Sequence, residues 1–394
     1  MKKFVYLCGM MLLSLNIMAQ IDLNDKNWDI GHAFLEEFDT NRSWDENSWI
    51  SLPDSIWKAY YGNVIHGIEA QIYQYDHCLF DTTNSMMRII SEYDAYDSIP
   101  LYHYQLPSGL MHPNAYNSHD TLFYFSGELR ACNRRFKYGY FEIRCRLPQH
   151  KGTFPAFWLQ KSSTNSHDPY YEEIDIFEHT RHHMNPSSGN PNNQNVEDTA
   201  RIFSVGIYHN LTGQSPDLST EHYASNYLMV PDTSNDLSDW HTFGCEWLPD
   251  HVYWYLDGCL INSYFDQEHI PCHEMNLIAN YAIDRYALKH DKINNTWNPI
   301  WFGSAEMDID YIHVYQLIWN CGIDEIITCQ TDLDSFEYGV KKSVSITSTN
   351  GESIISSNDK VTFRVTDSFE VTGAFQVSNG AEFTVLMQDC KSDN

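Results

Sequence analysis

The stretch that decides the fold reads Glu-Ile-Asp-Ile-Phe-Glu at residues 173–178. Acidic and large apolar side chains alternate along it, which is the period-two pattern of a β-strand with one polar and one buried face. On a regular strand Glu173 and Asp175 share a face, whereas Glu178 has the opposite parity. One extra residue at Ile176-Phe177, a β-bulge, would return Glu178 to the face of the other two acids.

Three carboxyl groups on one face suit retaining glycoside hydrolysis. In that reaction one carboxylate is the nucleophile and another acts as acid and then base, with the two groups roughly 5–5.5 Å apart. Clustered negative charge disfavours full ionisation, so one group can stay protonated and donate its proton to the leaving oxygen. The spacing alone is a weak signal, because residues 332–337 repeat it. The apolar residues between the acids and the aromatic segments on both sides distinguish 173–178.

The segments around this stretch also have the pattern of strands. Period-two alternation rich in aromatic and β-branched residues runs through 138–147, 240–260 and 307–316. Pro249-Asp250 and Asp257-Gly258 supply turn signals within the second segment. Many strands and few helical stripes predict an all-β antiparallel sandwich.

Composition limits the classes of function. The 394 residues include 24 Lys+Arg against 53 Asp+Glu, a formal net charge of −29, which excludes an ordinary basic nucleic-acid binder. Residues 1–19 hold two lysines and an apolar run ending in Ile17-Met18-Ala19, which predicts a cleaved export signal and no membrane span. We therefore expect an exported protein, located in the periplasm, on the outer surface or outside the cell.

The cysteines are interpreted as structural. Cleavage of residues 1–19 would leave nine of them, an odd number, so at least one stays unpaired. Cys132 and Cys145 flank a turn-like segment at 136–139, which predicts that they lie across a hairpin. No C-x-x-C spacing typical of zinc or redox sites occurs in the sequence. Residues 213–239 are rich in Asn, Ser, Asp and Pro, which predicts a long surface loop.

Aromatic density falls after Gln316, which predicts a linker at 317–340 and a small β-repeat module at 341–394. A Phe-x-Val unit recurs in this module at spacings of 6, 6 and 8 residues. Stacked rungs of a small β-solenoid could bury these residues in a common column, and ordinary strands of a small sandwich are the alternative. The units begin at Phe363, Phe369, Phe375 and Phe383.

The order of motifs resembles that of glycoside hydrolase family 16. The acidic run is preceded by an entry-strand motif at 35–39 and by motifs at 125–127, 138–144 and 154–159, and is followed by motifs at 240–247, 254–258 and 307–315. The resemblance covers about residues 30–316, so we expect a catalytic unit at 20–316. The six-residue form of the acidic motif resembles the bulged branch of the family, with laminarinases, agarases, porphyranases and carrageenases.

The resemblance implies a jelly roll with a curved cleft that carries out retaining endo-hydrolysis of a β-linked polysaccharide, a β-glucan or an algal galactan. By position, Glu173 is the nucleophile, Glu178 the acid/base and Asp175 the assisting carboxylate. No cofactor is required for this chemistry, and the protein is expected to act as a monomer. A glycan-binding jelly roll without turnover and a transglycosylase remain as alternatives.

Five further residues are candidates for binding. Trp158 could stack on a sugar ring or pack in the core, and His209 could line the cleft or lie in a solvated loop. Arg144 could neutralise a cleft acid or pair elsewhere. Arg181 belongs to a cationic patch at 179–183 that could bind sulfate or carboxylate groups, solubilise a loop or, as the weakest alternative, hold zinc. The resemblance further implies that Asp310 could help bind a structural calcium ion.

Overall fold

The computed structural model describes residue 28 and residues 33–40, 42–45, 50–52, 56–59, 71–93, 124–161, 172–179, 202–209, 221–229, 236–266, 269–284, 289–291, 296–298, 301–317, 319–330, 333, 339–349, 351–357 and 360–387. This part is built almost entirely of strands, with a short 3₁₀ helix, η2 (Tyr75–His77), before β6. The predicted all-β class is confirmed.

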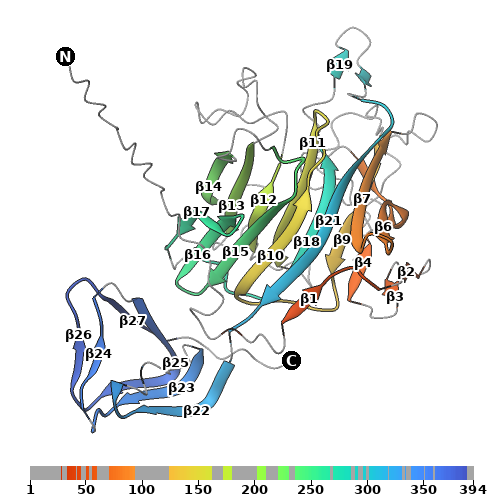
Figure 1. Ribbon diagram of the computed structural model, residues 1–394. Helices are drawn as coiled ribbons and strands as arrows, with labels where there is room; N and C mark the ends of the chain where they lie inside the picture. Colours follow the sequence, from red (N-terminus) through yellow and green to blue (C-terminus); the bar gives the residue numbers. More distant parts are fainter. Residues whose placement is uncertain are drawn as a thin grey trace, which may run out of the picture.

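Two large sheets pack face to face (Figure 1). The ten-stranded sheet has the order β17 (Cys259–Tyr264), β16 (His251–Leu256), β15 (His241–Leu248), β10 (Gly139–Arg146), β21 (Ser304–Tyr315), β7 (Met86–Tyr93), β8 (Tyr124–Ser126) and β5 (Gln71–Tyr73), while β1 (Phe34–Glu36) pairs with β21 and β6 (Cys78–Asp81) with β7. The seven-stranded sheet has the order β14 (Glu221–Met229), β13 (Ile202–His209), β12 (Glu172–Glu178), β11 (Thr153–Lys161), β18 (Met275–Ile283), β9 (Glu128–Ala131) and β4 (Trp57–Ala59). Two short hairpins pair β2 (Ser43–Trp44) with β3 (Ser51–Leu52), and β19 (Lys289–Asp291) with β20 (Thr296–Asn298).

Period-two alternation decides which face of each strand enters the core. In β10, Phe141, Ile143 and Cys145 are fully buried between the sheets, while Glu142 and Arg144 lie on the outer face. The same rule buries Phe157 of β11 and many other large side chains in one cluster shared by both sheets. Burial of each such side chain contributes about 1.5–3 kcal/mol, so this cluster is the main source of stability.

The predicted turn at Asp257-Gly258 closes a two-residue hairpin between β16 and β17, where Leu256 pairs with Cys259. Both turn residues have positive φ, 50° and 75°, as a type I′ turn requires. The Asp257 carboxylate also accepts a hydrogen bond from the backbone N–H of Thr242 on β15 at 2.9 Å. The turn is thereby fixed to the neighbouring strand, and the register of three strands is set together.

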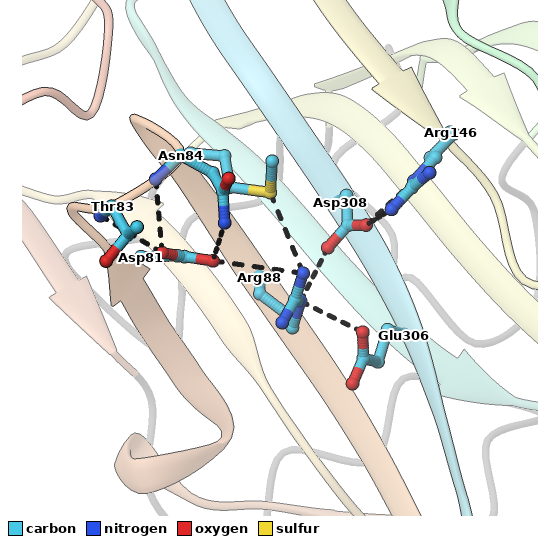
Figure 2. Close-up of polar contacts among 8 residues, drawn as sticks. Asp81, Thr83, Asn84, Arg88, Arg146, Glu306 and Asp308 are labelled. Atoms are coloured by element: carbon cyan, nitrogen blue, oxygen red, sulfur yellow. Dashed lines mark hydrogen bonds and ion pairs between the residues drawn. The ribbon is translucent and has the colours of Figure 1, made fainter.

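A buried carboxylate joins three strands on the outer face of the ten-stranded sheet (Figure 2). Asp308 of β21 accepts hydrogen bonds from Arg88 Nε of β7 at 2.7 Å and from Arg146 Nη2 of β10 at 2.6 Å. Glu306 lies 2.9 Å from Arg88 Nε, and the pKa of Arg88 is raised, chiefly by its hydrogen bond to Asp308. These pairs hold β7, β21 and β10 in register.

Two expectations about this region are wrong. Cys132 follows β9 of the seven-stranded sheet and Cys145 lies in β10 of the ten-stranded sheet, so the segment between them connects the two sheets and is no hairpin. Both are free thiols, whereas Cys321 is disulfide-bonded. The expected loop at 213–239 contains β14, an edge strand paired with β13, because polar composition does not prevent pairing at the edge of a sheet.

The C-terminal strands pair in parallel, unlike nearly all pairs of the sandwich. The order is β22 (Trp319–Ile327), β23 (Val340–Ile346), β25 (Lys360–Val371) and β27 (Glu382–Met387), with β24 (Ser353–Ile355) paired to β26 (Phe375–Val377). The segment expected as a linker at 317–340 therefore contains a strand. Arg364 of β25 contacts Asp250, between β15 and β16, with Nη2 3.0 Å from Oδ1.

Parallel pairing is what a β-solenoid requires, but the rung differs from the repeat seen in the sequence. Phe363 pairs with Val385, 22 positions later, so one turn of this coil contains several Phe-x-Val units rather than one. The phenylalanines still meet: the rings of Phe363, Phe369 and Phe375 each lie 5.2–5.7 Å from the ring of Phe383. They form a hydrophobic cluster separate from the core of the sandwich.

The bulge predicted in β12 is present. On the β13 side, Asp175 pairs with Gly206 and Glu178 with Ser204, so two residues of β12 oppose one of β13. A bulge takes backbone groups out of the ladder, and the Asp175 carbonyl accepts a hydrogen bond from the indole Nε1 of Trp254 at 2.8 Å. Trp254 belongs to β16 of the opposite sheet and is fully buried. The indole therefore supplies, from the opposite side of the core, the hydrogen-bond donor that the carbonyl at the bulge needs.

We predict that Trp254→Phe lowers both stability and turnover. The phenyl ring keeps much of the packing, but the buried Asp175 carbonyl loses its donor at a cost of about 1–3 kcal/mol. Trp247→Phe is the matched control, because Trp247 is also fully buried in the same sheet and donates its indole N–H to the Pro271 carbonyl at 2.8 Å. Chemical denaturation should show similar losses in both variants, with turnover reduced more in Trp254→Phe; equal turnover would contradict a role for this bond at the bulge.

Candidate active site

The three acids of β12 lie on one face of the seven-stranded sheet. On β11 their register partners are Gln160 for Glu173, Trp158 for Asp175 and Ala156 for Glu178. On β13 the corresponding partners are Tyr208, Gly206 and Ser204. Each set of partners is spaced by two residues, and residues so spaced on a regular strand share a face. Both neighbouring strands thus place the three carboxyl groups on the same side, as the sequence predicts.

The opposite face of β12 packs into the core. Ile174, Ile176 and Phe177 are all buried in the main hydrophobic cluster, so both residues around the bulge point inward. The acid-bearing face instead carries a small apolar cluster of its own, made by Ala156, Trp158 and Ile278. The acids therefore sit beside apolar side chains on the face of the sheet that is turned away from the core.

Asp175 is the most deeply placed of the acids, with 2% of its surface exposed. Burial raises its pKa well above the usual range, and the charges of Glu178 and Glu173 add to the shift. Its Oδ2 atom is buried and has no hydrogen-bond partner among the described residues. Burial of this kind favours the protonated carboxyl group, which can donate a hydrogen bond, over a third negative charge.

The two flanking acids are only partly buried and can reach a ligand. The Ser204 hydroxyl lies 3.4 Å from Glu178 Oε2. Gly206 contributes no side chain beside Asp175. Glu173 and Glu178 are therefore accessible from the same side, with the buried carboxyl group of Asp175 between them.

Trp158 lies on the acid-bearing face but has only 6% of its surface exposed. Its indole Nε1 donates to Asn280 Oδ1 at 2.8 Å, and Asn280 Nδ2 donates to the Tyr73 hydroxyl at 2.8 Å. Trp158 thus lies on the acid-bearing face, next to Asp175 in the register of β11 and β12, and is held there by its hydrogen bond to Asn280. It is not a broadly exposed stacking platform.

Asn280 was missed from the sequence, together with Asn276 and the ion pair between Arg130 and Glu128. Asn280 pairs in register with Ala156 on one side and Glu128 on the other, which continues the acid-bearing face across β18 to β9. Arg130 Nη2 lies 2.9 Å from Glu128 Oε1. The available signal was the pair of asparagines spaced by four residues within the otherwise apolar strand at 275–283.

Arg144 does not lie at this site. It belongs to the outer face of the ten-stranded sheet, where it forms an ion pair with Asp310 and lies over the ring of Trp240. Of the two alternatives for Arg144, the structure shows pairing elsewhere, because its side chain lies on the outer face of β10, away from the core. Asp310, expected as a calcium ligand, presents its carboxylate to Arg144, and a cation would compete with that arginine.

Two predicted binding residues are not settled by the structure. His209 pairs in register with Glu172, whereas Tyr208 is the partner of Glu173. The side chain of His209 and the whole of Arg181 lie outside the described residues, as do residues 1–19. In the part of the chain that is described, no helix is long and apolar enough to cross a membrane.

Comparison with known proteins places this geometry in a family. The sequence model of glycosyl hydrolases family 16 matches residues 101–298, which include the bulged strand. A β-glucanase of Rhodothermus marinus is 27% identical over 194 residues, covering 46% of this chain and 58% of that protein. A kappa-carrageenase of Pseudoalteromonas carrageenovora is 26% identical over 210 residues, covering 50% of this chain and 48% of that protein. The chain thus spans only about half the length of these relatives.

A solved structure agrees with the fold. The endo-β-1,3-glucanase of Pyrococcus furiosus is 21% identical, with a TM-score of 0.50 over 76% of this chain and 98% of that one. At this identity the likeness shows the fold alone, a jelly roll of two packed sheets. The family model matches half of the chain and spans the acidic strand, so the chain belongs to glycosyl hydrolases family 16.

Proposed function

We propose that the protein is a retaining, endo-acting glycoside hydrolase that cleaves a β-linked polysaccharide. The observation that carries the proposal is the register of β12, which puts Glu173, Asp175 and Glu178 on one face. Retaining hydrolysis requires two carboxyl groups that act on one glycosidic bond from the same site. A glycan-binding protein without turnover has no need of this arrangement.

We assign the roles by the family resemblance, with Glu173 as the nucleophile, Glu178 as the acid/base and Asp175 as the assisting carboxylate. Glu178 protonates the glycosidic oxygen as Glu173 attacks the anomeric carbon, so the C–O bond to the leaving sugar breaks and a glycosyl ester with Glu173 forms. Glu178, now a carboxylate, then takes a proton from water, which attacks the same carbon and releases Glu173. Asp175 keeps its proton and donates a hydrogen bond to Glu173, which orients the nucleophile and stabilises its charge as the ester breaks.

The substrate class rests on the relatives, which include a β-glucanase and a kappa-carrageenase. We propose a β-glucan or an algal galactan, met outside the cytoplasm after export. Incubation with laminarin, mixed-linkage glucan, agarose, porphyran and carrageenan, scored for reducing ends and product length, distinguishes these substrates. Transfer to added oligosaccharides without net hydrolysis would favour a transglycosylase, and tight binding without release of reducing ends would favour a glycan-binding protein.

We predict that Glu173→Ala and Glu178→Ala each lower turnover of the polysaccharide by at least about 10²–10⁴-fold. The two roles are separated by added azide with an activated aryl glycoside. In Glu178→Ala azide should attack the glycosyl ester and give a β-glycosyl azide, whereas in Glu173→Ala it should replace the nucleophile and give the α-anomer. NMR of the product identifies the anomer.

Glu306→Ala is the control for this experiment, because Glu306 is a partly exposed acid of the ten-stranded sheet paired with Arg88. It should retain wild-type turnover. The opposite assignment of anomers would exchange the roles of Glu173 and Glu178. Near-wild-type rates in either site variant would remove that residue from the reaction.

We predict that Asp175→Asn raises thermal stability at neutral pH while lowering turnover. The raised pKa of Asp175 means that the unfolded chain releases this proton near pH ~3.9 while the folded chain keeps it, so its contribution to the free energy of unfolding falls as pH rises above ~4. An amide removes that penalty. The gain in melting temperature over wild type should therefore grow as the pH rises above about 4.

Asp81→Asn is a control of opposite sign. The pKa of Asp81 is lowered, first by its hydrogen bond with the Asn84 side chain, so its stabilising contribution is present at neutral pH and lost as pH falls through the folded pKa. Asp81→Asn should lower the melting temperature slightly at neutral pH and converge with wild type in acid. An Asp175→Asn curve parallel to wild type would contradict the assignment of a bound proton.

A further inference from the structure

A second cluster of chemically reactive groups lies at the start of the catalytic strand, on the side of β12 away from the three acids. Glu172, Cys272 and His273 each offer one ligand atom, and these atoms lie within 4.8 Å of one another. Within the described residues this is the one group of three or more His, Cys, Asp or Glu side chains arranged so closely. Glu172 is fully buried, while Cys272 and His273 are exposed.

The distances match the triangular face of a tetrahedral metal site. Cys272 Sγ lies 3.9 Å from Glu172 Oε1 and 3.7 Å from His273 Nδ1, while Nδ1 and Oε1 are 2.7 Å apart. Zinc bonds of about 2.0–2.3 Å to O, N and S place neighbouring ligand atoms about 3.3–3.6 Å apart. Two of the three edges are thus close to the required length, and the third needs only the Nδ1···Oε1 hydrogen bond to open by roughly half an ångström.

The backbone around the cluster is already held. The indole Nε1 of Trp247 donates to the carbonyl of Pro271, directly before Cys272, at 2.8 Å. Two backbone hydrogen bonds, of 2.8 and 2.9 Å, join Met275 to Phe136 just beyond His273. Glu172 Oε2 accepts the backbone N–H of His273 at 3.0 Å. A cation would therefore meet ligands whose main chain is fixed, with little ordering cost beyond side-chain rotation.

We propose that Glu172, Cys272 and His273 form a zinc site. A thiolate, an imidazole and a carboxylate together suit borderline-soft Zn²⁺ far better than Ca²⁺ or Mg²⁺, which prefer oxygen ligands. Binding releases the Cys272 thiol proton to solvent and leaves the imidazole proton on Nε2, while Nδ1 takes the metal. Among the described residues these three side chains are the only members of the cluster.

A metal ion at this site would cross-link two segments of the seven-stranded sheet. Glu172 is the first residue of β12 and the neighbour of Glu173, whereas Cys272 and His273 precede β18. A metal bound by all three groups joins these segments next to the bulged strand. A ligand that binds only the folded chain stabilises it in proportion to the logarithm of its free concentration, so zinc should raise the melting temperature.

Cobalt is the probe that reports the ligands directly. CoCl₂ added to the reduced, chelator-free protein should produce a thiolate-to-cobalt charge-transfer band, and ZnCl₂ should displace it. Calorimetry should give zinc binding at one site per chain. We expect Cys272→Ser to abolish the band and weaken zinc binding by more than about 100-fold, above the ~10–100-fold cost of losing an outer-shell partner. Glu172→Gln should keep the band but weaken zinc binding.

Cys259→Ser and His269→Gln are the controls, because each removes a potential metal ligand that is not part of the cluster. Cys259 is a partly buried free thiol, and His269 is paired with Asp266. Both should bind cobalt and zinc as wild type does. Far-UV circular dichroism establishes that Cys272→Ser folds. Absence of a charge-transfer band in the wild-type protein, or equal zinc affinity in folded Cys272→Ser, would overturn the proposal.

Discussion

The active face depends on one hydrogen bond that crosses the core. At the bulge of β12 the Asp175 carbonyl accepts the indole N–H of Trp254 from the opposite sheet. Without a donor at that point, a buried carbonyl would lose its partner, and a regular strand with full ladder pairing would be favoured. A regular strand would turn Glu178 toward the core. The position of Glu178, the proposed acid/base, in one sheet is thus stabilised by an aromatic residue of the other.

The two sheets consequently have different tasks. The ten-stranded sheet supplies Trp254 and is braced on its outer face by ion pairs such as those of Asp308 with Arg88 and Arg146 (Figure 2). The seven-stranded sheet carries the acids, Trp158 and the polar row that continues through Asn280. The ten-stranded sheet thus supports the strand that carries the acids. Such support suits a reaction in which the two carboxyl groups must be held at a defined separation.

The sequence predicts whatever depends on local parity and fails where contacts join distant segments. Alternation in 173–178 is enough to require a bulge, and Asp257-Gly258 is enough to define a hairpin. Parity cannot say which sheet a strand joins, so the two alternatives for Arg144 stayed open and Cys132 and Cys145 were assigned to a hairpin. The cluster of Glu172 with Cys272 and His273 joins residues 100 positions apart, and no local spacing reveals it. The solenoid rung was likewise hidden, because its 22-residue offset exceeds the Phe-x-Val spacing.

The contact between Arg364 and Asp250 ties the parallel coil of β22–β27 to the electrostatics of the sandwich. Asp250 Oδ2 lies 3.2 Å from His251 Nδ1, and His251 Nε2 lies 2.6 Å from the fully buried Glu246. Acid, histidine, acid and arginine thus form a chain of alternating charge through the junction. A protein shortened before the coil would leave Asp250 without Arg364 and with His251 as its remaining described partner. Through Arg364 the coil therefore supplies the positive charge that balances Asp250 of the jelly roll.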